Sequence, residues 1–467
     1  MDNHLLVRGG DVVDGTGAPP RRADVRVRDG RITDVADGLA PDGARVVDAE
    51  GAYVAPGLIE SHTHYDAAMW WDPDCDPMPA HGCTTLVMAN CGLGLAPLHA
   101  DDRDTIVDLF AFIEDIPAEA FRLAVPWTWE TYEEYRAVAR GHGTAVNTVG
   151  FLPHQLLRTW VMGDAAWERP ATDAEREQLC AVLDDALGAG ALGLSTSVMD
   201  TDRDNRPVPS RQADDAEFAA LVGVLARRGA TLQYVPRIRQ PEFLADIERV
   251  VELTGVAGVP LLVAGYQLEE SVADARQELD AFLAPYWDAG VPLWVNYSVR
   301  PSHVNMHFER SIMWSGIPAW HELANASPVD QRTWLGDPTW RDRARREWDS
   351  CTYTLVPIRG PERLLLMGGA HSGESLADAM ARTGAHPSDA LAHWLLATDL
   401  TGYIRTSHRA PTTPPRWTCC ARPSPCRARA TRARTSRCSV VPATRPTCSR
   451  TWCATSAASR WRRRCTR

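Results

Sequence analysis

The stretch that decides the fold of this chain reads PGLIESHTHYDAAMWWDP at residues 56–73 and continues as HGCTTLVMANCGLGLAP at residues 81–97. Its first part opens with a short apolar run, residues 57–59, which is typical of a buried strand. Side chains two residues apart on a strand point to the same face of the sheet. This spacing therefore predicts that His62 and His64 lie side by side at the carboxyl end of the strand.

A second apolar run, residues 84–89, is rich in β-branched residues and leads into Asn90-Cys91-Gly92. Two imidazoles and one thiolate, each at the carboxyl end of a strand, form a donor set that a borderline-soft divalent ion such as zinc prefers. The alternative is that His62 and His64 are core histidines and that Cys91 is a small buried residue. The two motifs together favour a metal site made of His62, His64 and Cys91.

These motifs resemble those of the amidohydrolase superfamily and, within it, the N-acyl-D-amino-acid deacylase or D-aminoacylase-like branch. That branch carries the motif pair HTHxD and GNCGxxxAP, which is similar to the sequence around His62 and Cys91. The resemblance covers residues 3–408. Its further segments are VPWTWETYEEY (125–135), FLPHQLLRTWVMG (151–163), GALGLSTS (190–197) and RPVPSR (206–211).

The resemblance implies a metal-dependent hydrolase that cleaves an amide C–N bond of a small acylated amino acid, so the expected partner is a small-molecule substrate. It also implies that Cys91 stands where other members have a metal-bridging carboxylated lysine, and this chain contains no lysine. By the same match, His154, Arg158 and Arg239 are expected to bind substrate.

The predicted elements indicate an α/β protein built on a distorted (β/α)₈ TIM-like barrel. Residues 1–56 contain short strands and predict a small β-sandwich domain, with Asp29-Gly30 as a two-residue hairpin turn. Residues 57–408 alternate between strand-like and helix-like segments, which is typical of such a barrel. We expect residues 409–467 to form an aberrant tail.

Two segments of the barrel region carry more specific signals. A helix is expected at 172–187, because Thr172 and Glu175 have the spacing of a capping box. Residues 301–345 are rich in tryptophan and methionine and read as a capping insertion whose large side chains form a hydrophobic core.

Composition limits the location and the partners of the chain. No run of eighteen apolar residues is present, and the first residues show no signal-peptide pattern. We therefore expect a cytoplasmic protein that does not enter a membrane and whose thiols are free to bind metal. Nucleic acid is not an expected partner, and the oligomeric state is left open.

Two metal-binding histidines of the resembling branch are missing here. One of them follows a strand in a segment like Y-x-x-H-x-R, and the other lies in a segment like I-S-H-H-K. On that match, Arg237 and either Gly265 or Tyr266 take their places. An arginine is a permanent cation and repels a metal ion. We therefore expect one zinc ion per chain, bound by the histidine pair and Cys91.

Residues 409–467 differ in kind from the rest of the chain. They contain 15 arginines, seven of the 12 cysteines and no acidic residue, which leaves 34 basic against 60 acidic residues elsewhere. They show no strand or helix period, so the last barrel strand cannot be built from them. This composition is typical of GC-rich DNA translated out of frame. The alternative is a genuine basic tail that binds nucleic acid or an acidic partner.

The catalytic aspartate that the resemblance implies is not found, because the last acidic residue of the chain is Asp399. Two functional hypotheses follow. The main one is a metal-dependent amidohydrolase of the deacylase type. The alternative is a degenerate amidohydrolase-fold protein with a binding role or a non-hydrolytic biosynthetic role. Without the expected general base, the sequence predicts little or no deacylase activity.

Overall fold

The computed structural model describes residues 4–406 apart from 239–241, 268–272, 299–303, 310, 352–357 and 359. The predictions for the 409–467 tail and for Arg239 therefore lie outside the described residues. The described chain divides into two compact units, one of residues 4–60 and 76–85 and the other of residues 61–75 and 86–406. The predicted domain boundaries at 56/57 and 408/409 stay predictions.

The first unit holds a mixed five-stranded sheet in the order β3-β2-β1-β4, with β5 paired to β1. Its strands are β1 (Leu5–Val12), β2 (Arg21–Arg28), β3 (Arg31–Ala36), β4 (Arg45–Asp48) and β5 (Tyr53–Val54). The predicted hairpin joins β2 to β3, and Asp29 and Gly30 have φ angles of 48° and 72°, as a type I′ turn requires. The small β domain expected from the sequence is confirmed.

The strands after this domain supply the body of the fold. They are β6 (Leu58–Glu60), β7 (Cys83–Met88), β8 (Asn147–Gly150), β9 (Leu152–Pro153), β10 (Gly193–Ser197), β11 (Thr231–Val235), β12 (Leu261–Gln267) and β13 (Leu293–Ser298). Strands β9 to β13 pair in parallel in chain order, and β6, β7 and β8 form a second sheet. Strands β8 and β9 flank Phe151 in one extended stretch, so the two sheets continue into each other.

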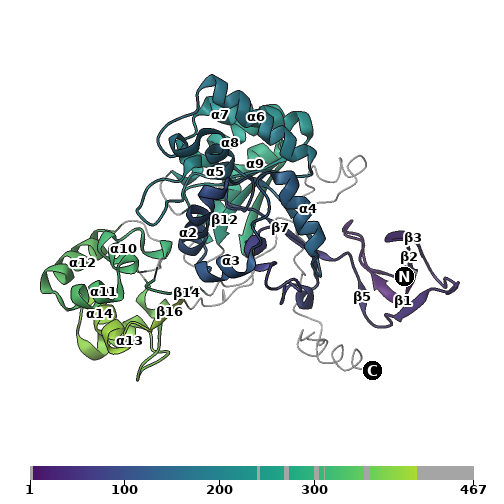
Figure 1. The fold of residues 1–467 in the computed structure, drawn as a ribbon. Coiled ribbons are helices and arrows are strands. Elements are labelled where there is room, and N and C mark those ends of the chain that lie inside the picture. Colours follow the sequence, from purple (N-terminus) through teal and green to yellow (C-terminus); the bar gives the residue numbers. More distant parts are fainter. Residues whose placement is uncertain are drawn as a thin grey trace. The chain divides into compact units, whose positions relative to one another are not determined.

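Helices alternate with these strands, as the sequence predicts. They are α1 (Tyr65–Ala68), α2 (Arg103–Ile113), α3 (Ala118–Ala124), α4 (Tyr132–His142), α5 (His154–Met162), α6 (Asp173–Gly188), α7 (Asp215–Arg228), α8 (Phe243–Ala257) and α9 (Ala273–Asp288). In Figure 1, α5 to α9 lie around the strand labelled β12. The expected capping box is present at the start of α6, where Thr172 and Glu175 exchange side-chain to backbone hydrogen bonds. The α/β fold is therefore confirmed.

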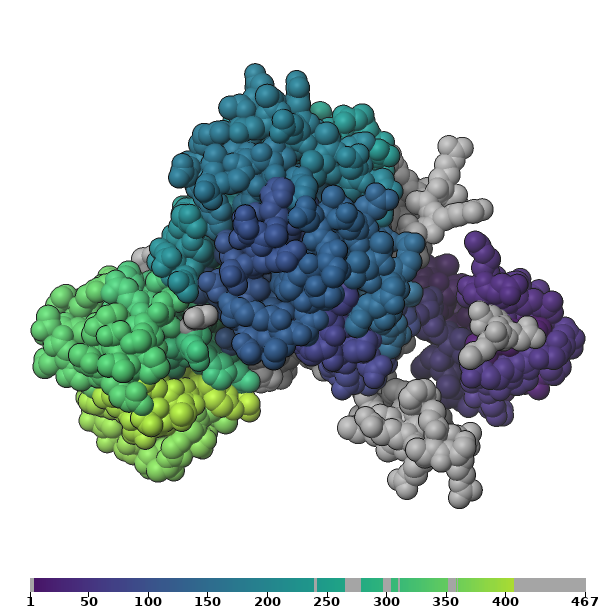
Figure 2. All heavy atoms as spheres, viewed as in Figure 1, coloured from purple at the N-terminus to yellow at the C-terminus, as the bar shows by residue number. Residues whose placement is uncertain are grey.

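Residues after β13 form a helical part with its own hydrophobic core. Its elements are β14 (Asn305–Met306), α10 (Pro318–Asn325), α11 (Pro328–Gly336), α12 (Pro338–Ser350), β15 (Leu364–Met367), α13 (Leu376–Thr383), α14 (Pro387–Ala397) and β16 (Tyr403–Thr406). Figure 2 shows this part in green to yellow. Trp314 and Trp320 are fully buried in its core, which confirms that the tryptophans of this segment serve packing.

Single 3₁₀ turns complete the described elements. They are η1 (Pro79–His81), η2 (Ala100–Asp102), η3 (Gly163–Trp167), η4 (Pro209–Gln212), η6 (Ile312–Trp314) and η7 (Pro361–Arg363). No helix among the described residues is long and apolar enough to cross a membrane. Within the same residues, no further parallel strand follows β13; the next strands, β14 to β16, pair antiparallel.

Candidate metal centre

The two histidines of the HxH motif lie just beyond β6, in a loop and not on the strand itself. The strand ends at Glu60, and His64 is the residue before the first turn of α1. Thr63 pins the loop to β7, because its backbone N–H and its hydroxyl both donate to the carbonyl of Val87. The prediction that strand alternation places His62 and His64 side by side is therefore wrong. Their positions are set by the loop that Thr63 binds to β7.

Cys91 lies three residues beyond β7, in a loop with an unusual backbone. Ala89 and Cys91 have φ angles of 54° and 59°, in the left-handed region that residues with a Cβ rarely adopt. Asn90 holds this loop against the HxH loop, since its side-chain amide donates to the carbonyls of Thr63 and Val87. Such strained residues persist only where the surroundings fix them, and they gather at functional sites.

Polar side chains of the next strands fix the Cys91 loop from the other side. Gln233 on β11 accepts a hydrogen bond from the Cys91 backbone N–H at 2.8 Å, and Ser195 on β10 accepts one from Gly92 at 3.1 Å. Gly92 has a φ angle of 74°, and a Cβ there would lie 3.3 Å from the side chain of Gln155. The loop is thus held by buried groups of β10 and β11.

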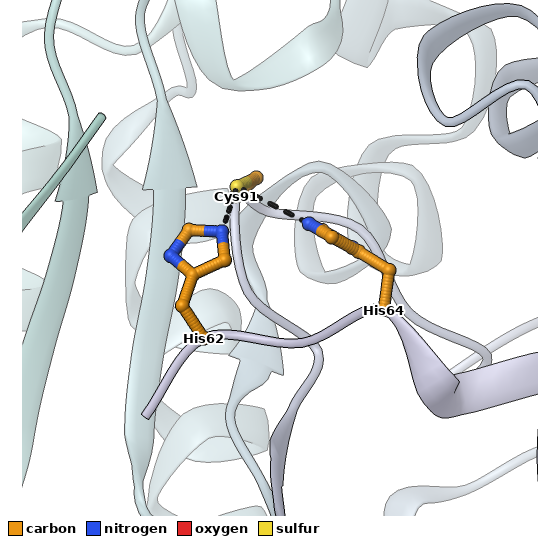
Figure 3. A group of neighbouring side chains, drawn as sticks. All are labelled: His62, His64 and Cys91. Carbon is orange, nitrogen blue, oxygen red and sulfur yellow. Dashed lines mark hydrogen bonds between the residues drawn. The ribbon is translucent and has the colours of Figure 1, made fainter. Parts of the chain in front are cut away.

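The structure brings His62, His64 and Cys91 together. The Cys91 sulfur lies 3.1 Å from His62 Nε2 and 3.6 Å from His64 Nε2. One ligand atom from each residue lies within 4.8 Å of the other two. Figure 3 shows both imidazoles turned with a nitrogen toward the sulfur. These three residues are the one metal-type cluster of histidine, cysteine or acidic residues found in the described part of the chain.

Burial sets the protonation of this cluster. Burial, followed by the charge of His64, lowers the pKa of His62 to about 3, and burial lowers the pKa of His64 to about 4. Burial raises the pKa of the Cys91 thiol well above its usual range, and the nearby carboxylates add to this effect. Two neutral imidazoles and a thiol that a cation can deprotonate form a donor set that fits zinc.

Two buried carboxyl groups, Asp66 and Asp200, and the partly exposed carboxyl group of Glu114 lie near the cluster. Burial raises the pKa of Asp66 to about 7, that of Glu114 to about 7 and that of Asp200 to about 6. Asp66 accepts the backbone N–H of Ala89 at 3.2 Å and so supports the strained loop. Glu114 Oε1 lies 3.3 Å from His64 Nε2. Carboxyl groups are costly to ionise in such a place unless a cation pairs with them, so the site is suited to a cation.

His154 and Arg158 lie together on α5, but the structure places both of them in the interior. Each has a fully buried side chain. His154 donates to Glu217 at 2.8 Å and accepts from Thr196 at 2.9 Å, and Arg158 is paired with the other oxygen of Glu217. This network supports packing of α5, α7 and β10. Substrate binding by His154 and Arg158 stays a prediction.

The position expected to carry one of the missing histidines is occupied by an ion pair. The guanidinium of Arg237 binds both carboxylate oxygens of Asp246 on α8, at 2.7 and 2.9 Å, and the Arg237 backbone N–H donates to the same group. Arg237 is therefore paired with Asp246, and its guanidinium offers no lone pair to a metal ion.

Several residues of the site have no signal in the sequence. Asn296 on β13 lies with its amide 3.4 Å from His62 Nδ1, on the far side of the ring from Cys91. Turned to present its oxygen, this amide would accept a hydrogen bond from the Nδ1–H and leave Nε2 free to bind metal. Glu114 follows α2 and lies in neither motif. Gln233 lies on β11, where it reads as an ordinary strand residue.

Comparison with known proteins places the chain among amidohydrolases. A model described as the amidohydrolase family matches residues 45–327. N-acyl-D-aspartate deacylase from Alcaligenes xylosoxydans xylosoxydans is 41% identical over 192 residues, which cover 41% of this chain and 36% of the relative. An uncharacterised protein of Mycobacterium tuberculosis is 30% identical over 423 residues, 83% of this chain and 66% of the relative.

These values mean that the chain spans about one third to two thirds of the length of those two relatives.

Solved structures show the same fold. A D-aminoacylase described with a binuclear metal centre matches with a TM-score of 0.58 at 24% identity, over 88% of this chain and 72% of its own. N-acyl-D-glutamate deacylase from Bordetella bronchiseptica, complexed with zinc and a phosphonate inhibitor, matches over the same shares with a TM-score of 0.57 at 23% identity.

Proposed function

Because this chain belongs to the amidohydrolase family, we propose that it is a metal-dependent hydrolase that cleaves the amide C–N bond of a small N-acyl-D-amino acid. The observation that carries this proposal is the convergence of His62, His64 and Cys91 beyond the ends of β6 and β7. Barrels of this kind place their chemistry at the carboxyl ends of the strands. The relatives named as deacylases support the hydrolytic hypothesis over the degenerate alternative.

We propose one zinc ion per chain as the cofactor. A bound zinc ion would polarise the amide carbonyl and make water a stronger nucleophile. The chain itself supplies the ligand atoms of His62, His64 and Cys91, the backbone bonds that fix the Cys91 loop, and an Asn296 amide that sets the orientation of His62. The buried carboxyl group of Asp200, whose pKa burial raises to about 6, can hold or release a proton near the ligands.

We also propose a cytoplasmic location. The described cysteines, Cys75, Cys83, Cys91, Cys180 and Cys351, are all free thiols. Free thiols in a protein of this size are typical of a reducing compartment, which would also keep Cys91 available for metal.

The sequence predicts little or no deacylase activity because the expected aspartate is missing, but the buried Asp200, whose pKa burial raises to about 6, can serve as the general base. We therefore propose hydrolysis of N-acyl-D-amino acids as the activity. The purified chain, loaded with zinc, should release free amino acid from at least one of N-acetyl-D-aspartate, N-acetyl-D-glutamate and N-acetyl-D-leucine, and not from the L forms. Cys91→Ala protein should lose this activity, because it lacks a ligand. Amino acid release measured by derivatisation and chromatography checks this result. No release from any D substrate by zinc-loaded protein would favour the catalytically silent alternative.

A further inference from the structure

A cavity of about 100 Å³ lies between the helices α2 and α5 and the turns η3 and η4. Its apolar wall includes Ile106 and Leu109 of α2 and Leu156 of α5, which are all buried. A water molecule needs about 10–15 Å³ of such space, so the cavity has room for a molecule of several non-hydrogen atoms. The described residues that line it do not include the proposed metal ligands, so it is separate from the metal cluster.

Gln155, near the start of α5, presents an unpaired amide to this cavity. The residue lines the cavity and is 1% exposed. Neither its amide nitrogen nor its amide oxygen has a hydrogen-bond partner within the described part of the chain. An unpaired buried amide is costly, and it offers both donors and an acceptor. A bound molecule that carries both kinds of group would remove this cost.

Two carboxylates line the more exposed side of the cavity. They belong to Asp102, which is half-buried just before α2, and to Asp164, which is exposed on η3. Burial raises the pKa of Asp102, and the charge of Asp164 adds to this effect, so the two groups lie near each other. Two neighbouring carboxylates that lack a shared cation favour a ligand with a positive charge.

Arg206 supplies the opposite charge on the same lining. Its guanidinium carbon lies 3.9 Å from the centre of the Trp167 ring, and this contact holds the guanidinium over the aromatic face. Its Nε donates to Asp202 at 3.0 Å, and no described residue accepts a hydrogen bond from Nη1 or Nη2. Two adjacent guanidinium N–H groups are the arrangement that binds a carboxylate through paired hydrogen bonds.

The cavity also touches the loop that carries Cys91. A Cβ added at Gly92 would lie 3.3 Å from Cγ of Gln155, so the Gln155 side chain packs against the residue that follows Cys91. A molecule that binds the Gln155 amide is therefore separated from the Cys91 loop by one side chain.

Charges of both signs decide the class of ligand. An anion alone would meet two carboxylates, and a cation alone would meet a guanidinium, whereas a zwitterion pairs with both. We propose that the cavity binds a small free α-amino acid, with its ammonium at Asp102 and Asp164, its carboxylate at Arg206 and a hydrogen bond to Gln155. In the proposed function such a molecule is the product. That identification rests on the proposed function, but the binding site itself does not.

Isothermal titration calorimetry of the full-length, zinc-loaded protein with D-alanine tests this proposal. The parent protein should bind D-alanine at least about 10-fold more tightly than propionate, which lacks the ammonium, or ethylamine, which lacks the carboxylate. Asp164→Asn and Gln155→Met should each weaken D-alanine binding by at least about 10-fold, the effect of losing one hydrogen bond to a charged group. Asp185→Asn, the same change at an exposed residue of α6 outside the cavity, should match the parent.

A Cys91→Ala variant separates this site from the metal site. It should bind D-alanine as the parent does, because none of the proposed contacts uses the metal. Loss of binding in Cys91→Ala protein, or undiminished binding in both cavity variants, would place the amino acid elsewhere and overturn the proposal. Absence of measurable binding by the parent would overturn it as well. D-alanine binding by a parent protein that hydrolyses no substrate would support the cavity site while the proposed function fails. Circular dichroism checks the fold of each variant, and Asp164→Asn changes only an exposed side chain.

Discussion

Replacing both His62 and His64 by alanine is expected to abolish tight zinc binding and, with it, hydrolysis. Loss of an outer partner of a ligand already costs about 10- to 100-fold in metal affinity, so loss of two direct ligands should cost at least ~10⁴-fold. Cys91 alone supplies one ligand atom, which is too few to hold the ion tightly. Competition with a chromophoric chelator measures the change in affinity.

The matched control for this variant is His81→Ala, because His81 is exposed and lies outside the cluster. The control should keep the zinc affinity and the activity of the parent protein. Equal zinc affinity in the double variant and in the control would mean that the ion, if bound, is held elsewhere. Far-ultraviolet circular dichroism should be unchanged in both proteins, since the double substitution removes side chains and leaves the backbone bonds of Thr63 in place.

Replacing Glu217 by glutamine is expected to destabilise the folded chain by about 3–5 kcal/mol, the usual cost of removing one partner of a buried ion pair. Arg158 would be left buried without its counter-charge, and His154 would lose a charged acceptor. Urea unfolding followed by circular dichroism at pH 7 measures the loss. Glu177→Gln, an exposed change on α6, should stay within about 0.5 kcal/mol of the parent protein.

The pH dependence of this difference has a definite sign. Burial by itself would raise the pKa of Glu217, but hydrogen bonds and charge from His154 and Arg158 outweigh it and lower the pKa to about 2, from an ordinary value of 4.5. The folded state therefore gains stability from ionised Glu217 above pH 4.5 and loses that contribution as the pH falls toward 2. The difference in free energy of unfolding between the parent protein and Glu217→Gln should have its full size at pH 7 and should shrink below pH 4.5. A difference in free energy of unfolding below about 1 kcal/mol at pH 7 would contradict a stabilising ion pair between Glu217 and Arg158.

Much of the fold could be predicted from the sequence because its signals are local. The Asp29-Gly30 turn, the Thr172 capping box and the apolar runs of β10 and β11 each specify an element without reference to distant residues. The tryptophan-rich segment was also predictable as a core. The strand alternation predicted for the HxH motif was wrong, because hydrogen bonds from Thr63 to another strand, and not the local backbone, place the two histidines.

The candidate site was only half predictable, for the same physical reason. His62, His64 and Cys91 are marked by short motifs, but Glu114 and Asn296 come from segments that reach the cluster only after folding. Nothing in the sequence around Glu114 distinguishes it from a surface acid. The burial of His154 and Arg158 was also hidden, since their partner Glu217 lies on α7, 63 and 59 residues away.

The measurement that tests the central claim most directly is the metal content of the purified full-length chain by elemental analysis. The account predicts about one zinc ion per chain, because the described residues form one cluster of histidine and cysteine ligands and Arg237 blocks a second. The Cys91→Ala variant, purified in the same way, should contain almost no zinc. Two tightly bound ions per parent chain, or full zinc content in Cys91→Ala protein, would contradict the account.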